Sequence, residues 1–106
     1  MEHLEGAGAF TATGGSNHWV EHLRVPAMSV GTYSIPVGGT DDQMPHAEDK
    51  IYVVRAGRAS FSAGGETVHV HPGATLFVGA GEEHRFHDVT EDLALLVVFA
   101  PPFSGD

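Results

Sequence analysis

The sequence predicts an all-β fold, a single small barrel of antiparallel strands. Fourteen glycines in 106 residues fall between short apolar runs, which is typical of a chain with many strands and tight turns. Several of these runs alternate apolar and polar residues with a period of two, and no window shows the 3.6-residue period of an amphipathic helix. We therefore expect about eight short strands, closed or nearly closed into a jelly-roll sandwich.

The strands follow from the apolar runs and from the turn residues that interrupt them. Pro36 and the glycines at 38–39 end the second strand, and Gly57 ends the third. Gly64 and Gly65 both accept a positive φ, so they predict a two-residue hairpin. The expected strands are residues 19–25, 28–35, 51–55, 58–63, 67–70, 74–78, 84–89 and 93–99.

The chain is expected to form one domain. Residues 1–16 are small and rich in glycine, which predicts a loose N-terminal arm. Residues 17–100 would form the barrel, and residues 101–106 an irregular C-terminal tail. A length of 106 residues is enough for one hydrophobic core.

Composition limits the classes of function. A hydrophobic content of 42% with a net charge of −9 indicates a globular protein that repels nucleic acid. No apolar run approaches the roughly 20 residues that span a bilayer, and the acidic start does not resemble a secretory signal. The chain has no cysteine, which excludes disulfides and thiolate chemistry and fits a cytoplasmic protein.

Two segments carry spaced motifs that resemble the paired motifs of the cupin superfamily. The family motifs read G-x5-H-x-H-x3-E-x6-G and G-x5-P-x-G-x2-H-x3-N, and this chain keeps every interval. The matching positions are Gly38, Met44, His46, Lys50 and Gly57 in the first segment, and Gly73, Gly79, Gly81, His84 and Asp88 in the second.

The resemblance implies a cupin jelly-roll barrel in which His46 and His84 converge inside. It also implies a metal site, but Met44 stands where the family has its first metal-binding histidine, and Lys50 where it has the metal-binding glutamate. A thioether is a weak ligand for divalent first-row metals, so Met44 is expected to form an apolar wall. The motifs are therefore kept in spacing, with a degenerate ligand set.

Lys50 is the only lysine of the chain, and three interpretations of it remain open. It serves as a cation for an anionic ligand, or as a base or Schiff-base amine with a pKa lowered by burial. Alternatively, His46 and His84 still hold a metal, with help from Glu48 or Asp42. In the third interpretation, Lys50 extends outward to water.

Strand periodicity indicates which side chains share a face. Met44, His46, Lys50 and Tyr52 have one parity, as do His84, Phe86 and Asp88 in the second motif. Tyr52 is the candidate polar group among the apolar residues. Asp41 and Asp42 are expected to be solvated turn residues. The candidate lining of a ligand pocket is Tyr33, Ile35, Tyr52, Phe77, Phe86, Val97 and Phe99.

These residues lead to one main hypothesis of function and two alternatives. The first is a small-molecule enzyme, of isomerase, lyase or cyclase type, that uses His46, Lys50, His84 and Tyr52 for acid–base or electrophilic chemistry. The alternatives are a metal-dependent oxygenase or isomerase with Fe, Mn, Zn or Ni at His46 and His84, and a non-catalytic binding or sensing domain. The expected partners are a small organic ligand, anionic in one interpretation, and a second copy of the chain, with Trp19 buried in a homodimer.

Overall fold

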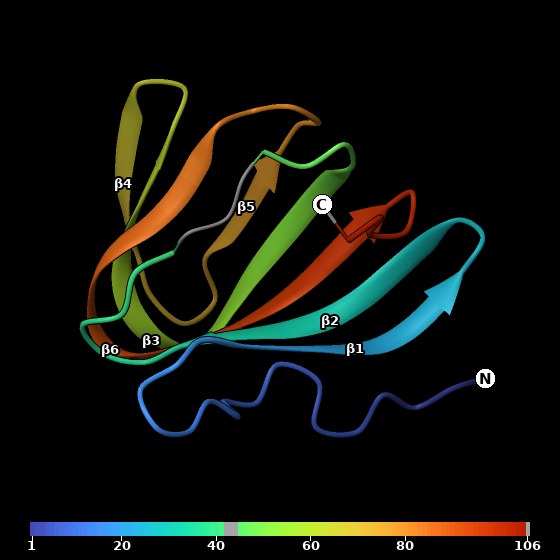
Figure 1. Cartoon of the computed structure of the whole chain (residues 1–106), viewed down its shortest axis with the longest axis horizontal. Helices are drawn as coiled ribbons and strands as arrows, with labels where there is room; N and C mark the ends of the chain where they lie inside the picture. The colour runs from blue at the N-terminus through green and yellow to red at the C-terminus, as the bar shows by residue number, and fades with distance from the viewer. Residues whose placement is uncertain (42–44, 106) are drawn as a thin grey trace.

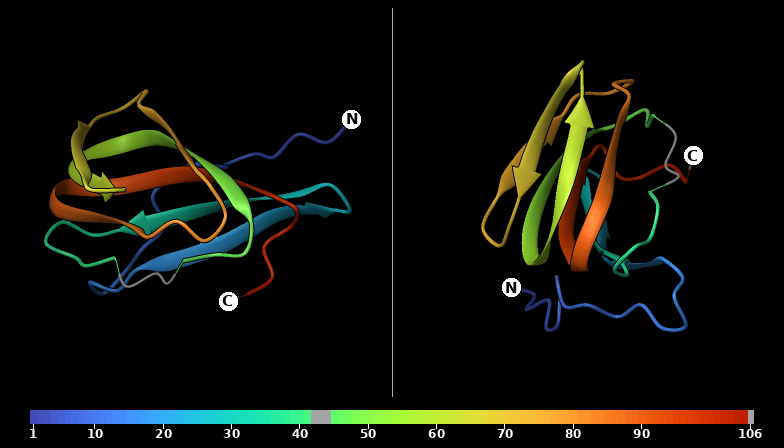
Figure 2. Two further views of the ribbon diagram at one scale, coloured as in Figure 1. Left: turned by 90° about the horizontal axis from the view of Figure 1, so that it is seen from above. Right: turned by 90° about the vertical axis from the view of Figure 1, so that its left-hand side faces the viewer.

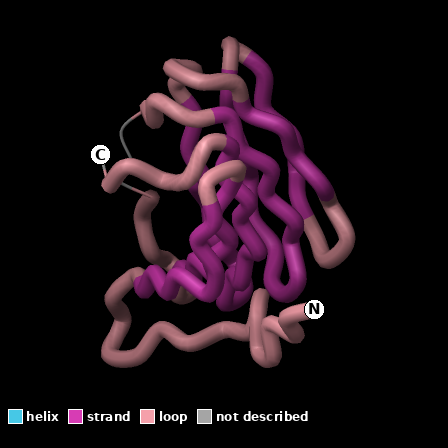
Figure 3. The backbone as a smooth tube through the Cα atoms, turned by 90° about the vertical axis from the view of Figure 1, so that its right-hand side faces the viewer, coloured by secondary structure: helices cyan, strands magenta, loops and turns pink. Residues whose placement is uncertain are grey.

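The computed structural model describes residues 1–41 and 45–105 and contains six antiparallel strands. Strand and loop are the only structures in this described part, as Figure 3 shows. No helix in these residues is long and apolar enough to cross a membrane. The strands are β1 (His18–Val25), β2 (Met28–Ile35), β3 (Asp49–Ala63), β4 (Glu66–Val70), β5 (Thr75–Val78) and β6 (His84–Ala100).

The two long strands, β3 and β6, organise the sheet. The hydrogen-bonded order is β1-β2-β6-β3-β4, and β5 pairs with β3 near its beginning. Both long strands curve strongly, so the sheet wraps around an interior (Figures 1 and 2). The predicted all-β class is confirmed. Residues 50–53 of β3 pair with β5, which belongs to the second motif segment, and Ile51 lies opposite Phe77.

The expectation of about eight short strands is wrong, because two predicted pairs of strands are continuous. Residues 51–55 and 58–63 merge in β3, and residues 84–89 and 93–99 merge in β6. Gly57 has a φ of 90° and lies where the β3–β6 register shifts. A Cβ there would collide with the backbone of Asp92 and Leu93. The glycine therefore makes a bulge that bends β3 across its partner, where the sequence predicted a turn.

The period of two places alternate residues of β3 inside and outside the barrel. Lys50, Tyr52 and Val54 are buried, whereas Ile51 is 40% exposed. Phe77 lies opposite Ile51 and is 67% exposed, so its predicted place in the lining is wrong. The buried core consists of Ile35, Tyr52, Val54, Ala59, Phe61, Val70, Val78, Phe86, Val89, Leu93, Leu95, Val97 and Phe99.

The N-terminal segment lies against the outer face of β2. The backbone N–H of Gly8 donates to Thr32 Oγ1 at 2.7 Å, and that of Thr11 donates to Ser34 Oγ at 3.0 Å. Thr32 and Ser34 are almost fully buried as a result. Figure 1 shows the segment in dark blue, running beside β1 and β2. A third contact joins Thr11 Oγ1 to Nδ1 of His18 in β1 at 2.8 Å.

Candidate functional site

Lys50 lies inside the barrel with its amine against a histidine. Its side chain comes from the beginning of β3 and is only 2% exposed. The Nζ atom is 2.7 Å from Nδ1 of His46, which is itself 6% exposed. The interpretation in which Lys50 extends outward to water is therefore wrong, and the amine is part of the interior.

Two aromatic rings lie beside the Lys50 amine. Nζ lies 4.9 Å from the ring centroid of Tyr52 and 5.4 Å from that of Phe99, within the range of cation–π attraction. Burial nevertheless dominates and lowers the pKa of Lys50 to about 8, although the carboxylates of Asp41 and Glu48 raise it. The amine is therefore mostly protonated at pH 7 and loses its proton within reach of ordinary buffers.

His46 is a neutral acceptor beside this amine. Burial, followed by the charge of Lys50, lowers the pKa of His46 to about 4. Since the Lys50 ammonium can only donate, Nδ1 of His46 accepts, and the ring proton is assigned to Nε2. The His46 and His84 rings lie with their centroids 6.1 Å apart, so the structure brings the two motif histidines together.

His84 pairs with Tyr52. Nδ1 of His84 lies 2.8 Å from the backbone oxygen of Glu82, so Nδ1 carries the proton and donates to this carbonyl. Nε2 then accepts from the Tyr52 hydroxyl at 3.2 Å. Burial lowers the pKa of His84, and the imidazole is neutral at pH 7. His46, Lys50, Tyr52 and His84 together are called the interior cluster below.

Asp41 is a site residue that the sequence analysis assigned to solvated turns, and that expectation is wrong. It is 6% exposed. Its Oδ1 accepts from the Tyr33 hydroxyl at 3.1 Å, and its Oδ2 accepts from the Phe86 N–H at 2.9 Å. Its charge raises the pKa values of Lys50 and His46. Local sequence gives no sign of this role, because the Phe86 N–H that binds Oδ2 lies 45 residues further along the chain.

Glu48 brings a second buried carboxylate to the same end of the barrel. The side chain is 3% exposed, and its Oε1 has no hydrogen-bond partner within the described residues. The carboxylate raises the pKa of His46 and of Lys50, so it is close enough to act on the interior cluster. A buried acceptor without a donor costs free energy, and a ligand hydroxyl or amine would satisfy it.

The described residues do not fit the divalent metal that cupins often bind. Among residues 1–41 and 45–105, no three His, Asp or Glu side chains are placed to hold one ion. The Lys50 amine takes Nδ1 of His46, and an ammonium repels a dication. Met44 and Asp42, two further residues of the sequence prediction, lie outside the described residues.

The second motif departs from strict alternation after Phe86. His84 and Phe86 are buried, as expected, but Asp88 is exposed and Val89 is buried. Asp88 has a φ of 50°, which shifts the strand by one residue at that point. The predicted common face of His84, Phe86 and Asp88 is therefore wrong for Asp88.

Aromatic rings close the end of the barrel beside His46. Phe99 and Phe103 lie with their centroids 5.4 and 5.2 Å from that of His46. Trp19 lies edge-on to both rings, and a Cβ on Gly31 would collide with its indole. Trp19 thus packs within its own chain. Phe103 was missed by the sequence analysis, because nothing in the tail sequence indicates that it folds back.

Comparison with known proteins assigns the family. Residues 31–99 match the family model for the cupin domain. An uncharacterized protein of Streptomyces coelicolor is 48% identical over 86 residues, which cover 81% of this chain and 82% of the relative. The family match over residues 31–99 contains both motif segments.

Solved structures show the same fold at low sequence identity. A cupin superfamily protein of Desulfitobacterium hafniense has a TM-score of 0.75 at 14% identity, over 86% of this chain and 83% of its own. A proposed mannose-6-phosphate isomerase of Ralstonia eutropha has a TM-score of 0.78 at 17% identity, over 94% and 98%. A predicted oxalate decarboxylase of Thermotoga maritima has a TM-score of 0.69 at 22% identity, over 79% of each chain.

Proposed function

We propose, on the premise that this chain belongs to the cupin family, that it is an enzyme acting on a small organic molecule by acid–base chemistry inside its barrel. The observation that carries the proposal is the contact of 2.7 Å between Lys50 Nζ and His46 Nδ1 in a buried setting. A charged amine beside a neutral imidazole provides a donor and an acceptor in one place. Several structural neighbours carry enzyme names, which supports this class of function.

The protonation states indicate which residue of the interior cluster would donate a proton or hydrogen bond and which would accept one. At pH 7 the Lys50 ammonium is a donor and an electrophilic group, because the pKa of its amine is about 8. His84 Nε2 is an acceptor that the Tyr52 hydroxyl faces. We infer that Lys50 binds a carbonyl or carboxylate oxygen of the ligand and stabilises the negative charge that develops there. Nε2 of His84 then takes the proton from the neighbouring carbon once the Tyr52 hydroxyl has released its hydrogen bond to this nitrogen, and the imidazolium later returns a proton to the product.

Glu48 suggests a second feature of the ligand. Its buried Oε1 has no partner among the described residues, and a carboxylate oxygen accepts only from an O–H or N–H donor. A small hydroxycarbonyl compound would place its carbonyl oxygen at Lys50 and a hydroxyl at Glu48. We therefore expect the substrates to belong to this chemical class.

Deuterium exchange tests the proposal without knowledge of the natural reaction. Hydroxyacetone, dihydroxyacetone and hydroxypyruvate are incubated with the protein in D2O, and exchange of the carbon-bound hydrogen next to the carbonyl is followed by NMR. We expect the wild-type protein to accelerate exchange of at least one of them. Lys50→Met should lose about 100-fold or more of that acceleration, whereas Arg58→Gln, an exposed control, should retain it.

The same experiment separates the alternatives. Exchange that persists in Lys50→Met would contradict the role given to the amine. Binding of a probe without exchange in either protein would favour a non-catalytic binding or sensing domain. Exchange that appears only after addition of Mn²⁺ or Ni²⁺ would favour the metal-dependent alternative.

We also propose that the chain forms a homodimer. Ile51 and Phe77 are cross-strand partners on the outer face of β3 and β5, and they are 40% and 67% exposed. Exposed apolar side chains of this size are typical of an interface. Light scattering at dilute concentration should give twice the chain mass, and Phe77→Ser should shift the mass toward that of one chain. A wild-type monomer mass would contradict the proposal.

A further inference from the structure

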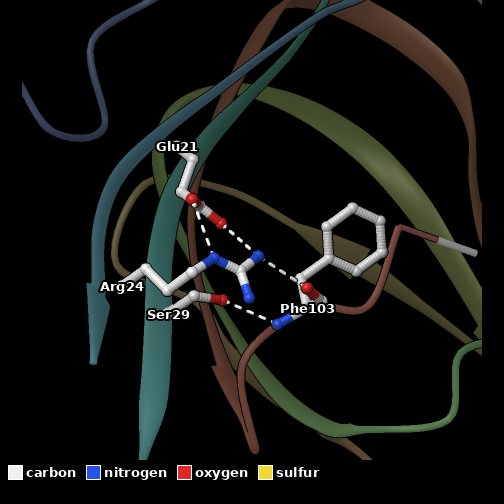
Figure 4. Close-up of polar contacts among 4 residues, drawn as sticks. All are labelled: Glu21, Arg24, Ser29 and Phe103. Atoms are coloured by element: carbon white, nitrogen blue, oxygen red, sulfur yellow. Dashed lines mark hydrogen bonds and ion pairs between the residues drawn. The ribbon is translucent and has the colours of Figure 1, made fainter. Parts of the chain in front are cut away.

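The C-terminal segment folds back over the interior cluster. β6 ends at Ala100, and residues 101–105, here called the cover, form no strand. Phe103 projects from the cover toward the barrel end that holds His46, and Figure 4 shows how its backbone is fastened. The cover therefore lies beside the proposed site and is continuous with one of its walls, since β6 also carries Phe99.

Two hydrogen bonds fasten the cover at Phe103. Its N–H donates to Oγ of the buried Ser29 at 2.9 Å, and its carbonyl accepts from Nη2 of Arg24 at 2.6 Å. Glu21 fixes the Arg24 guanidinium with two contacts of 2.7 and 3.1 Å. Arg24 is exposed, so this attachment lies at the surface, where it can release without disturbing the core.

The Phe103 ring occupies a place between aromatic groups. It stacks on Phe99 with centroids 4.7 Å apart and planes inclined by 23°. It also meets His46 edge-on at 5.2 Å and Trp19 edge-on at 5.8 Å. A flat apolar group in this position would lie against Phe99 and next to an imidazole of the interior cluster.

The interior cluster is closed to solvent in this arrangement. Lys50 and Tyr52 are 2% and 1% exposed, and His46 and His84 are 6% and 8% exposed. A ligand can reach these groups only if some part of the wall moves. The cover is an irregular segment in ring contact with His46, whereas Phe99 belongs to β6, which is paired with strands on both sides.

We propose that the cover is released when a ligand binds. Phe103 fills an aromatic subsite beside His46, and the hydrogen bond from Arg24 at the surface keeps the ring in this subsite. A flat apolar group of the ligand takes the place of the ring. The ligand class is thereby narrowed to small molecules that carry such a group next to the polar part. This inference rests on the proposed function only for the place of the ligand, and it requires no particular reaction.

Chemical labelling measures access to His46 directly. Diethyl pyrocarbonate modifies unprotonated imidazoles, and peptide mass spectrometry gives the rate at each histidine. In the wild-type protein we expect His46 to react much more slowly than the exposed His71. Arg24→Gln and Ser29→Ala should each raise the rate at His46 by about three- to tenfold, and the rate at His71 should not change.

Controls separate release of the cover from unfolding. Arg58→Gln removes another exposed arginine, which lies in a different ion pair, and should leave the rate at His46 unchanged. Release of a short segment exposes little surface, so the rate should depend only weakly on urea below the unfolding transition. Equal rates at His46 in wild-type, Arg24→Gln and Ser29→Ala proteins would overturn the proposal, as would a strong urea dependence.

Binding of indole tests the subsite itself. NMR titration should show weak binding to the wild-type protein and about tenfold tighter binding to Phe103→Ala, where the ring no longer competes. Val68→Ala removes an exposed apolar side chain of β4 and serves as the control, and Phe103→Leu is the alternative if Phe103→Ala does not fold. Indole binding that is the same with and without the Phe103 ring would overturn the proposal. Neither experiment depends on catalysis, so failure here leaves the deuterium exchange result intact.

Discussion

Because the Lys50 amine is buried, we expect the free energy of unfolding to depend on pH, and comparison with Lys50→Met isolates the part of this dependence that is due to Lys50. Methionine has a similar length and fills the same space without a charge. It removes the contact with His46 and the attraction of Tyr52 and Phe99 for the cation. Because Lys50 is the only lysine, the variant has no ε-amino group left to titrate between pH 7 and 10.

The sign and size of the effect follow from the two states of the wild-type protein. The pKa of Lys50 is about 8 in the folded chain, against an ordinary value of 10.5. Between these values the unfolded chain holds the proton and the folded chain does not, so the free energy of unfolding rises with pH. The whole window corresponds to about 3 kcal/mol at 1.36 kcal/mol per pH unit. Most of this, about 2 to 3 kcal/mol, should accrue between pH 7 and 10.

Urea denaturation at pH 7, 8, 9 and 10 measures this dependence in both proteins. The quantity of interest is the free energy of unfolding of the wild-type protein minus that of Lys50→Met, because other titrating groups contribute nearly equally to both. We expect this difference to move in favour of the wild-type protein by about 2 to 3 kcal/mol over the range. A difference that stays constant within about 0.5 kcal/mol would refute the assignment of Lys50 as a buried amine with a lowered pKa.

Three further predictions follow from the same end of the barrel. Lys50→Glu should bind Mn²⁺ or Ni²⁺ more tightly than the wild-type protein in calorimetry. The substitution removes a repulsion of about 4 kcal/mol per unit-charge pair at 4 Å and adds a carboxylate ligand. Equally tight binding by the wild-type protein would contradict this. Gly31→Ala should destabilise the fold by about 1 to 3 kcal/mol in urea, because its Cβ would meet the Trp19 ring, whereas Gly79→Ala, whose Cβ has ordinary space, is the control. As the pH falls from 6.5 to about 4, the free energy of unfolding of the wild-type protein should fall by about 1 to 3 kcal/mol more than that of His46→Gln. In this range His46 binds a proton in the unfolded chain and stays neutral in the folded chain. Equal losses in the two proteins would contradict the lowered pKa of His46.

The period of two predicted that Lys50 and Tyr52 share a face of their strand, but the sequence left open whether the Lys50 amine points inward or out to water. Both lie on the buried face of β3, as a regular strand requires. The alternation of buried and exposed residues is interrupted at Asp88, whose positive φ could not be predicted from the residue type. Gly57 was interpreted as a turn, because turns and bulges both use glycine at positive φ, and only the pairing of distant strands separates the two.

Phe77, Asp41 and Phe103 show where local sequence is insufficient. The side of β5 on which Phe77 lies is set by its pairing with Ile51, and apolar character alone placed it wrongly in the lining. Asp41 is buried because Tyr33 and the backbone of Phe86 satisfy its oxygens. Phe103 reaches His46 because Arg24 and Ser29 hold the tail. Each of these placements depends on at least one contact with a segment that is far away in the chain.

The most direct test of the central claim is the titration of Lys50 itself. Protein labelled with ¹³C-lysine contains a single lysine, so its Cε resonance reports one amine without assignment. We expect a midpoint near pH 8 in the folded protein and near the ordinary value of lysine in urea. A folded midpoint near 10.5, the same as in urea, would contradict the claim that this amine is a buried acid–base group of the barrel.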